Sequence, residues 1–239
     1  MEEFEVLSNG MKILQSDRLF RLGTDSMLLS DFCLPTRGQR IADLGCGGGA
    51  LGVLLCANDP KCEVTGVEIQ SEAVRIAQKN IAMNGLGDRF HVISGDLREI
   101  RTLCPPNSFD CVVSNPPYFP VGSGLVAESE AIAIARTECC CTLDDLCDCS
   151  AWLLRFGGSF YVIHRPERLA ELIYALKARN LEPKRLRMVR HHPGADISLI
   201  LLEARLGAKP GLRFEPELVL YDANGEMSGE YRRIYHISP

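Results

Sequence analysis

The regular alternation of short apolar runs with helical segments restricts the possible folds of this chain more than any other feature. Seven runs read as strands because they are short, apolar and bounded by turn residues or helices. Strands that alternate with helices indicate an α/β protein with a doubly wound, mostly parallel sheet, here of seven strands. The predicted strands are 40–46, 63–69, 90–96, 109–115, 159–164, 185–192 and 197–206.

The segment before this alternation reads differently. Residues 5–15 resemble a β-hairpin around Asn9-Gly10, and a short helix follows at 24–32 with Thr24 or Asp25 as its N-cap. We therefore divide the chain into an N-terminal hairpin and helix extension, 1–34, and one large domain, 35–239.

Helices are predicted between and after the strands. One long helical region, 128–155, ends where Gly157-Gly158 breaks it, and the helix at 166–180 carries a proline in its first turn. The other predicted helices are 49–59 and 71–85, the second of which has Val74, Ala77 and Ile81 on one face.

Composition sets the broad class. Of the 239 residues, 46% are hydrophobic and 24% charged, which is ordinary for a globular protein. No run approaches the roughly 18 apolar residues of a membrane span, and the acidic N-terminus does not resemble a signal peptide. We expect a cytoplasmic monomer that does not contact membranes. The net charge of −5 argues against a general nucleic-acid coat protein but allows a local basic surface.

Cysteine is frequent, with 11 residues, and no two stand in the Cys-x-x-Cys spacing typical of zinc sites. The densest group lies in the predicted helical region before residue 155. A metal or redox cluster there is one interpretation; we favour reduced thiols packed on a buried helix, and no metal. The group consists of Cys139, Cys140, Cys141, Cys147 and Cys149.

A glycine-rich loop, Asp43 to Ala50, joins the first parallel strand to its helix. Gly45, Gly47 and Gly49 let the backbone approach a ligand closely, and the helix N-terminus beyond them offers free N–H groups. A nucleotide or a related molecule fits such a loop. The spacing also satisfies a dinucleotide fingerprint, so the loop alone leaves the ligand open.

Acidic residues end the next two strands. Glu68 can accept hydrogen bonds from both hydroxyls of a ribose, and Ile69 beside it is included in the predicted cofactor site. Asp96 can bind the amino group of an adenine, with the backbone N–H of Leu97 reaching the ring. The alternative for Asp96 is an N-cap of the segment that follows, and the two roles can coexist.

The fourth strand ends in Asn115-Pro116-Pro117-Tyr118, which a plain turn does not require. An exocyclic amine such as adenine N6 is a poor nucleophile because its lone pair is delocalised into the ring. The Asn115 side-chain oxygen and the Pro116 carbonyl can each accept one N–H, which frees the lone pair for a methyl group. Tyr118 supplies a face for stacking an extruded base. Hydride transfer has no use for this motif.

The combination of "DLGCGGG", Glu68, "GDL" and "NPPY" resembles the class I S-adenosylmethionine-dependent amino-methyltransferases of the small-methyltransferase type. Almost the whole chain is similar to the bacterial tRNA1(Val) adenine-N6 methyltransferases, in particular "FRLGTDSMLLSDF" and the closing "EPELVLYDANGEMSGEYRRIY". The resemblance implies methylation of the adenine beside the anticodon of a valine tRNA.

The resemblance also implies roles for individual residues. S-adenosylmethionine would lie along Asp43, Gly45 and Gly47, with Glu68 on its ribose and Asp96 on its adenine. The Asn115–Tyr118 motif would hold the target base. Thr24 and Asp25 would come near the methionine end of the cofactor. The loop after the motif, 119–131, departs from the family because it is neither aromatic-rich nor basic, which leaves the substrate less certain than the chemistry.

A local group of basic residues suggests an RNA-binding surface, because along the sequence only Glu182 opposes it. A solvated helix end is the plainer interpretation. The group comprises Lys177, Arg179, Lys184, Arg185, Arg187 and Arg190, followed by His191 and His192; Arg136, Arg165, Arg168, Arg232 and Arg233 could extend it. His164, at a strand end, reads as structural or RNA-contacting rather than catalytic.

The sequence thus predicts an enzyme that methylates adenine N6 in tRNA. The same chemistry on ribosomal RNA, DNA or a protein glutamine stays open, since a glutamine amide is an equally poor nucleophile. A nicotinamide-dependent oxidoreductase and a catalytically silent RNA-binding protein are more distant alternatives.

Overall fold

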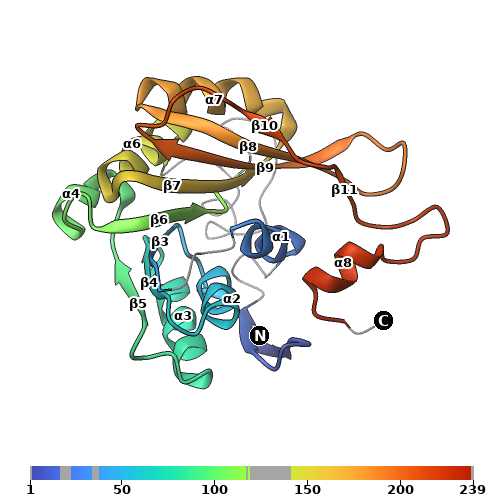
Figure 1. Ribbon diagram of the computed structural model, residues 1–239. Helices are drawn as coiled ribbons and strands as arrows, with labels where there is room; N and C mark the ends of the chain where they lie inside the picture. Colours follow the sequence, from blue (N-terminus) through green and yellow to red (C-terminus); the bar gives the residue numbers. More distant parts are fainter. Residues whose placement is uncertain (1, 17–22, 34–37, 117, 119–140, 238–239) are drawn as a thin grey trace, which may run out of the picture.

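The computed structural model shows a central sheet covered by helices on both faces, with a separate hairpin at the N-terminus (Figure 1). The structure describes residues 2–16, 23–33, 38–116, 118 and 141–237. Within these residues, none of the helices is both long and apolar enough to cross a lipid bilayer.

The strands of the sheet run in the order β10-β8-β9-β7-β6-β3-β4-β5. Among the strands that the structure describes in this sheet, only β9 is antiparallel to its neighbours, β7 and β8. The predicted doubly wound, mostly parallel sheet of seven strands is confirmed, and two very short strands, β10 (Arg213–Phe214) and β11 (Leu218–Val219), are added on β8. The seven are β3 (Arg40–Leu44), β4 (Glu63–Glu68), β5 (Phe90–Ser94), β6 (Phe109–Ser114), β7 (Leu154–His164), β8 (Leu181–Arg190) and β9 (Ile197–Leu206).

Alternate side chains of the strands build two separate cores, one on each face of the sheet. On β3, Ile41 packs into the first core and Ala42 into the second; on β6, Val113 and Val112 divide in the same way. The first core is covered by α1 (Thr24–Phe32), α2 (Ala50–Asn58), α3 (Ser71–Met83) and α8 (Gly229–Ile234), and the second by α4 (Ile100–Leu103), α6 (Leu143–Leu153) and α7 (Leu169–Ala178).

The predicted hairpin is confirmed: β1 (Glu2–Val6) pairs with β2 (Lys12–Ser16). Its β2 edge is fixed to α3 by two asparagines one helical turn apart. The Asn84 amide bonds the backbone N–H and carbonyl of Lys12 at 2.9 and 2.7 Å, and the Asn80 amide does the same for Leu14 at 2.6 and 3.1 Å. These four bonds satisfy the outer edge of β2 and hold the hairpin against the domain.

Two predicted details are wrong. The N-cap of α1 is Gly23, with no side-chain cap, rather than Thr24 or Asp25, because both of these side chains bond groups elsewhere in the fold. The predicted helix up to Arg155 ends at Leu153, and Gly157-Gly158 lie inside β7. There the glycines form a bulge: Phe109 pairs with Leu154, but Cys111 pairs with Ser159. The first part of that predicted helix, 128–140, lies outside the described residues.

The cysteines of α6 are packed in the second core. Cys147 and Cys149 are buried, and burial raises the pKa of each thiol to about 12. Such thiols stay protonated at neutral pH and behave as small apolar groups. Cys141 is half-buried, while Cys139 and Cys140 lie outside the described residues. Across the described ranges, no group of three or more His, Cys, Asp and Glu side chains is placed to hold a metal ion.

Candidate active site

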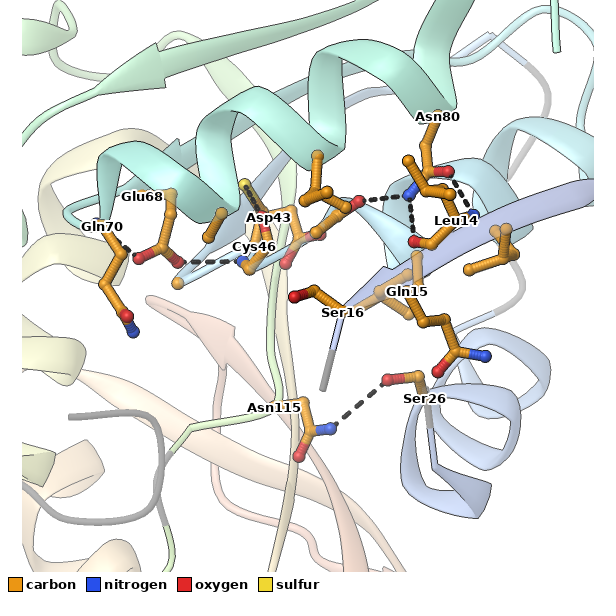
Figure 2. Close-up of a pocket in the computed structure, with 18 residues that line it drawn as sticks. Leu14, Gln15, Ser16, Ser26, Asp43, Cys46, Glu68, Gln70, Asn80 and Asn115 are labelled. Carbon is orange, nitrogen blue, oxygen red and sulfur yellow. Dashed lines mark hydrogen bonds between the residues drawn. The ribbon is translucent and has the colours of Figure 1, made fainter. Parts of the chain in front are cut away.

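A pocket lies where the carboxyl ends of β3, β4 and β6 meet the N-terminal hairpin (Figure 2). This is the edge of a parallel sheet at which ligands bind, next to the point where the strand order reverses. The sheet side of the lining was predicted: Asp43, Gly45, Gly47, Glu68 and Asn115 all take part. The opposite wall was not predicted, and it comes from β2 and α1, through Ile13, Leu14, Gln15, Ser16 and Ser26.

The glycine loop has the backbone conformation that only glycine adopts easily. Gly45, Gly47 and Gly49 have φ angles of 73°, 53° and 77°. A methyl group added at Gly45 or Gly47 would meet no atom of the protein within 4 Å, whereas one at Gly49 would lie 3.1 Å from the Cβ of Ala77. Gly45 and Gly47 therefore open onto the pocket, and Gly49 lets the loop pack closely on α3.

Asp43 is a buried carboxylate without a full set of partners. Its side chain is 1% exposed, and no described residue donates a hydrogen bond to Oδ2. Burial, aided by the nearby charge of Glu68, raises the pKa of Asp43 to about 7. A buried acceptor of this kind is suited to a positively charged or hydrogen-bonding group of a bound ligand.

Glu68 is held by backbone amides at the end of β4. Its Oε2 accepts from the N–H of Gly47 at 2.9 Å and its Oε1 from that of Gln70 at 2.8 Å. Burial raises its pKa, and the two amides oppose that rise. The bonds fix the carboxylate beside the glycine loop, and each oxygen keeps a further lone pair for a ligand hydroxyl.

Asn80 connects the two walls of the pocket and was missed in the sequence. It is fully buried on α3, and besides its bonds to Leu14 its Nδ2 donates to the carbonyl of Gly48 at 2.8 Å. One amide thus ties the hairpin to the glycine loop. The available signal was a polar residue three positions after Ala77, within the apolar face of the helix.

Asn115 faces the pocket at the end of β6, and both ends of its amide have partners. Nδ2 donates to the Ser26 hydroxyl at 3.3 Å, and Oδ1 accepts from the Tyr118 hydroxyl at 2.8 Å. The Tyr118 hydroxyl also bonds the carboxyl group of Asp25. The predicted grouping of Asn115 with Tyr118 is therefore present, and the Tyr118 ring lies 5.4 Å from that of His164, centre to centre. Pro116 is half-buried, and Pro117 lies outside the described residues.

Residues 20–137, which include the glycine loop and the Asn-Pro-Pro-Tyr motif, match the family model of the methyltransferase small domain. The chain is an S-adenosylmethionine-dependent methyltransferase. Among curated relatives, the tRNA1(Val) (adenine(37)-N6)-methyltransferase of Yersinia pseudotuberculosis serotype O:3 is 27% identical over 88% of this chain and 82% of its own. The protein of that name from Yersinia pestis (strain Pestoides F) is equally similar, with 84% of its length covered.

Solved structures show that the fold is shared widely among methyltransferases. A predicted O-methyltransferase from Agrobacterium tumefaciens superposes with a TM-score of 0.73 at 24% identity, over 89% of this chain and 95% of its own. A geranyl diphosphate C-methyltransferase from Streptomyces coelicolor, solved with S-adenosyl-L-homocysteine, gives 0.55 at 14% identity, over 75% and 78%. At these identities the similarity concerns the fold alone.

Other predicted cofactor residues of the methyltransferase lie outside the pocket lining. Asp96 caps the short helix Leu97–Glu99, accepts the N–H of Arg98 at 2.9 Å and pairs with the Arg98 guanidinium, which lowers the pKa of Asp96. The N-cap alternative is thus confirmed, and the adenine contacts of Asp96 and Leu97 stay predictions. Ile69 is 40% exposed. Thr24 bonds the hydroxyls of Tyr231 and Tyr235 at 3.1 and 3.3 Å, which joins α1 to α8.

The contacts observed for His164 in the methyltransferase are those of a structural residue. It is fully buried, and its Nδ1 accepts the N–H of Arg165 at 2.8 Å. Burial, together with the positive charge of Arg168, lowers its pKa to about 4, so the ring is neutral near pH 7. RNA contact by His164 stays a prediction.

The basic group of the methyltransferase is not a free cationic surface, because the fold brings acidic residues to it from distant segments. Arg185 pairs with Glu203 and Glu215, Arg187 with Glu230, and Arg190 with Glu217. Glu182 is the one acidic residue within this stretch of sequence, but in the fold acidic residues of other segments pair with the group, and RNA contact by these residues stays a prediction. The other pairs among the described residues are Lys177–Glu182, Arg179 with Asp144 and Asp148, Arg165–Glu167, Arg168–Glu171, Arg232–Glu226, and Arg233 with Asp31 and Glu230. Lys184 bonds the carbonyl of Lys209, and Arg136 lies outside the described residues.

Proposed function

We propose that the protein transfers a methyl group from S-adenosylmethionine to the N6 of an adenine in tRNA, and that this adenine is position 37, beside the anticodon of a valine tRNA. The observation that carries the proposal is the position of Asn115: its amide faces the same pocket as the glycine loop, Asp43 and Glu68 (Figure 2). The names of the curated relatives support the choice of tRNA and of adenine.

The residues of the pocket fit the cofactor. Bound there, S-adenosylmethionine supplies a methyl group activated by a sulfonium. Glu68 would accept hydrogen bonds from the ribose hydroxyls, and the unfilled Oδ2 of Asp43 would accept the ammonium group of the methionine part. Gly45 and Gly47 leave the space that the cofactor backbone needs, since an added Cβ at either position meets no protein atom within 4 Å. We further propose Asp96, Leu97 and Ile69 as contacts of the adenine end.

Asn115 acts on the substrate amine. Its Oδ1 and the carbonyl of Pro116 would each accept one N6–H of the target adenine, which directs the nitrogen lone pair toward the methyl group. No strong base is needed, because the nitrogen would lose its proton to water only after methyl transfer, when it is cationic, and S-adenosylhomocysteine would be the leaving group. The reaction would take place in the cytoplasm, where tRNA is modified.

The test is methyl transfer from labelled S-adenosylmethionine to unmodified bulk tRNA, followed by identification of the labelled nucleoside by mass. N6-methyladenosine, lost when position 37 of the valine tRNA is changed from adenine to guanine, is the expected result. Transfer into a protein glutamine, ribosomal RNA or DNA but not into tRNA would keep the chemistry and refute the substrate.

A further inference from the structure

Two consecutive residues of helix α1 are connected to the Asn115 amide, Ser26 directly and Asp25 through Tyr118. Ser26 accepts from Nδ2 directly, at 3.3 Å. Asp25 acts at the other end, because its carboxyl group bonds the Tyr118 hydroxyl, which lies 2.8 Å from Oδ1 of Asn115. Asp25 is not among the described residues that line the pocket, and within this part of the chain it reaches the site through the tyrosine.

The proton count of this chain of contacts allows two states. A tyrosine hydroxyl has one proton to donate, and both of its neighbours, an ionised Asp25 and the Asn115 oxygen, are acceptors. When Asp25 is protonated, it can donate to Tyr118, and Tyr118 donates to Asn115. When Asp25 is ionised, the charged carboxylate competes for the Tyr118 proton and forms the stronger bond. The Asn115 oxygen then loses its donor.

We propose that Asp25 is a positioning residue, whose ionisation draws the Tyr118 hydroxyl away from Asn115 and so opens the Asn115 oxygen to the substrate amine. The inference rests on the proposed function, since that oxygen is the group assigned to the N6–H. It gives Asp25 a role through Tyr118 instead of the contact with the cofactor suggested by resemblance.

The environment of Asp25 shifts its pKa upward, so its ionisation can be followed as a function of pH. Burial raises the pKa of Asp25, and the hydrogen bond from Tyr118 and the positive charge of Arg165 oppose the rise. Among the described residues, the charged and titratable groups that face Asp25 are Tyr118 after β6 and Arg165 after β7. Tyr231 and Tyr235, on and just after α8, bond the neighbouring Thr24. Turnover should therefore fall as the pH drops through the Asp25 pKa.

The first experiment measures kcat against pH for Asp25→Asn and Tyr118→Phe. Asp25→Asn should resemble the protonated state at every pH, with kcat about 10-fold lower and the acid-side fall lost. Tyr118→Phe removes the blocking hydroxyl and keeps the ring, so its kcat should not fall at low pH. S-adenosylmethionine affinity should stay within about twofold in both. The matched control is Asp31→Asn, which removes a carboxylate of the same helix that pairs with Arg233, and should keep the wild-type profile.

A wild-type pH profile in Asp25→Asn would overturn the inference, and so would a loss of cofactor affinity with unchanged kcat. A second measurement does not depend on the substrate: the side-chain amide signals of Asn115 by NMR, assigned by their loss in Asn115→Ala. They should shift with pH in the wild type and stay constant in Asp25→Asn and Tyr118→Phe. Amide signals that do not titrate in the wild type would refute the inference; signals that titrate in a protein inactive on tRNA would refute only the proposed function.

Discussion

The pocket and the outer part of the sheet treat buried charge in opposite ways. At the ends of β3 and β4, Asp43 is buried with an unfilled oxygen and a raised pKa. On β9, Glu203 is equally buried, at 2% exposure, but it accepts from Ser159 at 3.1 Å and from Arg185 at 3.0 Å. An unpaired buried carboxylate is costly, so it persists where a ligand completes it, whereas a paired one stabilises the fold.

The largest effect is expected where the pocket meets the substrate. Asn115→Ala should lower kcat by about 10²- to 10³-fold, as for the loss of one preorganised polar group of an active site. Unfolding by urea should change little, since the bonds of this side chain to described residues are two, with Ser26 and Tyr118. A kcat within a few-fold of the wild type would show that another group aligns the amine.

Asp43→Asn should separate binding from stability. S-adenosylmethionine affinity should fall about 10- to 100-fold, because the neutral amide no longer attracts a cation. The ligand-free protein should become more stable at pH 8 by about 1–2 kcal/mol. The sign follows from the raised pKa: the folded wild type holds its proton more tightly than the unfolded chain, so its stability is lost as the pH rises from about 4 to about 7.

A suitable control for that variant is Asp59→Asn. Asp59 is also buried, but its two oxygens accept the backbone N–H groups of Gly38 and Lys61 at 2.8 and 2.9 Å. Its loss should destabilise the protein and leave cofactor affinity unchanged. Stabilisation by both variants would mean that Asp43 does not differ from a buried structural carboxylate such as Asp59.

On the outer strands, Glu203→Gln should reduce the free energy of unfolding by about 1–2 kcal/mol, because it leaves Arg185 with one carboxylate instead of two. The loss is small because the Arg185 side chain is 27% exposed, so solvent screens the ion pair. Thermal or urea unfolding measures the change, and kcat at a temperature well below the transition should match the wild type. A large fall in kcat at that temperature would mean that Glu203 on the outer strands also supports the active-site pocket.

The smallest effect concerns the basic group. Lys177→Ala combined with Arg190→Ala should raise the KM for tRNA by about twofold or less, since both cations already pair with glutamates and would only exchange partners. Steady-state kinetics at low and moderate salt measures it. A tenfold rise with a marked salt dependence would establish these residues as phosphate contacts.

The sequence predicts the sheet well because its strands are apolar runs buried on both faces, as at Ile41–Leu44 and Cys111–Val113. It also predicts one wall of the pocket, because strand ends and glycine-rich loops are local features of the sequence. The other wall depends on Asn80, which reaches Leu14 across 66 residues of sequence, and no local pattern reveals such a contact.

Ion pairing is the property that local sequence patterns predict least well. Arg187 looks solvated beside Lys184 and Arg190, yet it is 9% exposed and bonds Glu230, 43 residues further on. The end of α6 is misjudged for another reason: Gly157 has a φ of 79° and normally marks a helix end, but here it serves a bulge in β7. Both errors arise where tertiary contacts override local preference.

The most direct test of the contrast between the two regions is a side-by-side measurement of unfolding free energy and methyl transfer to tRNA for Asn115→Ala and Glu203→Gln. Asn115→Ala is expected to unfold like the wild type but to transfer almost no methyl groups, and Glu203→Gln to be less stable but to transfer at the wild-type rate. Two variants that lose stability and activity together would contradict this expectation, because the pocket would then be no more specialised than the rest of the sheet.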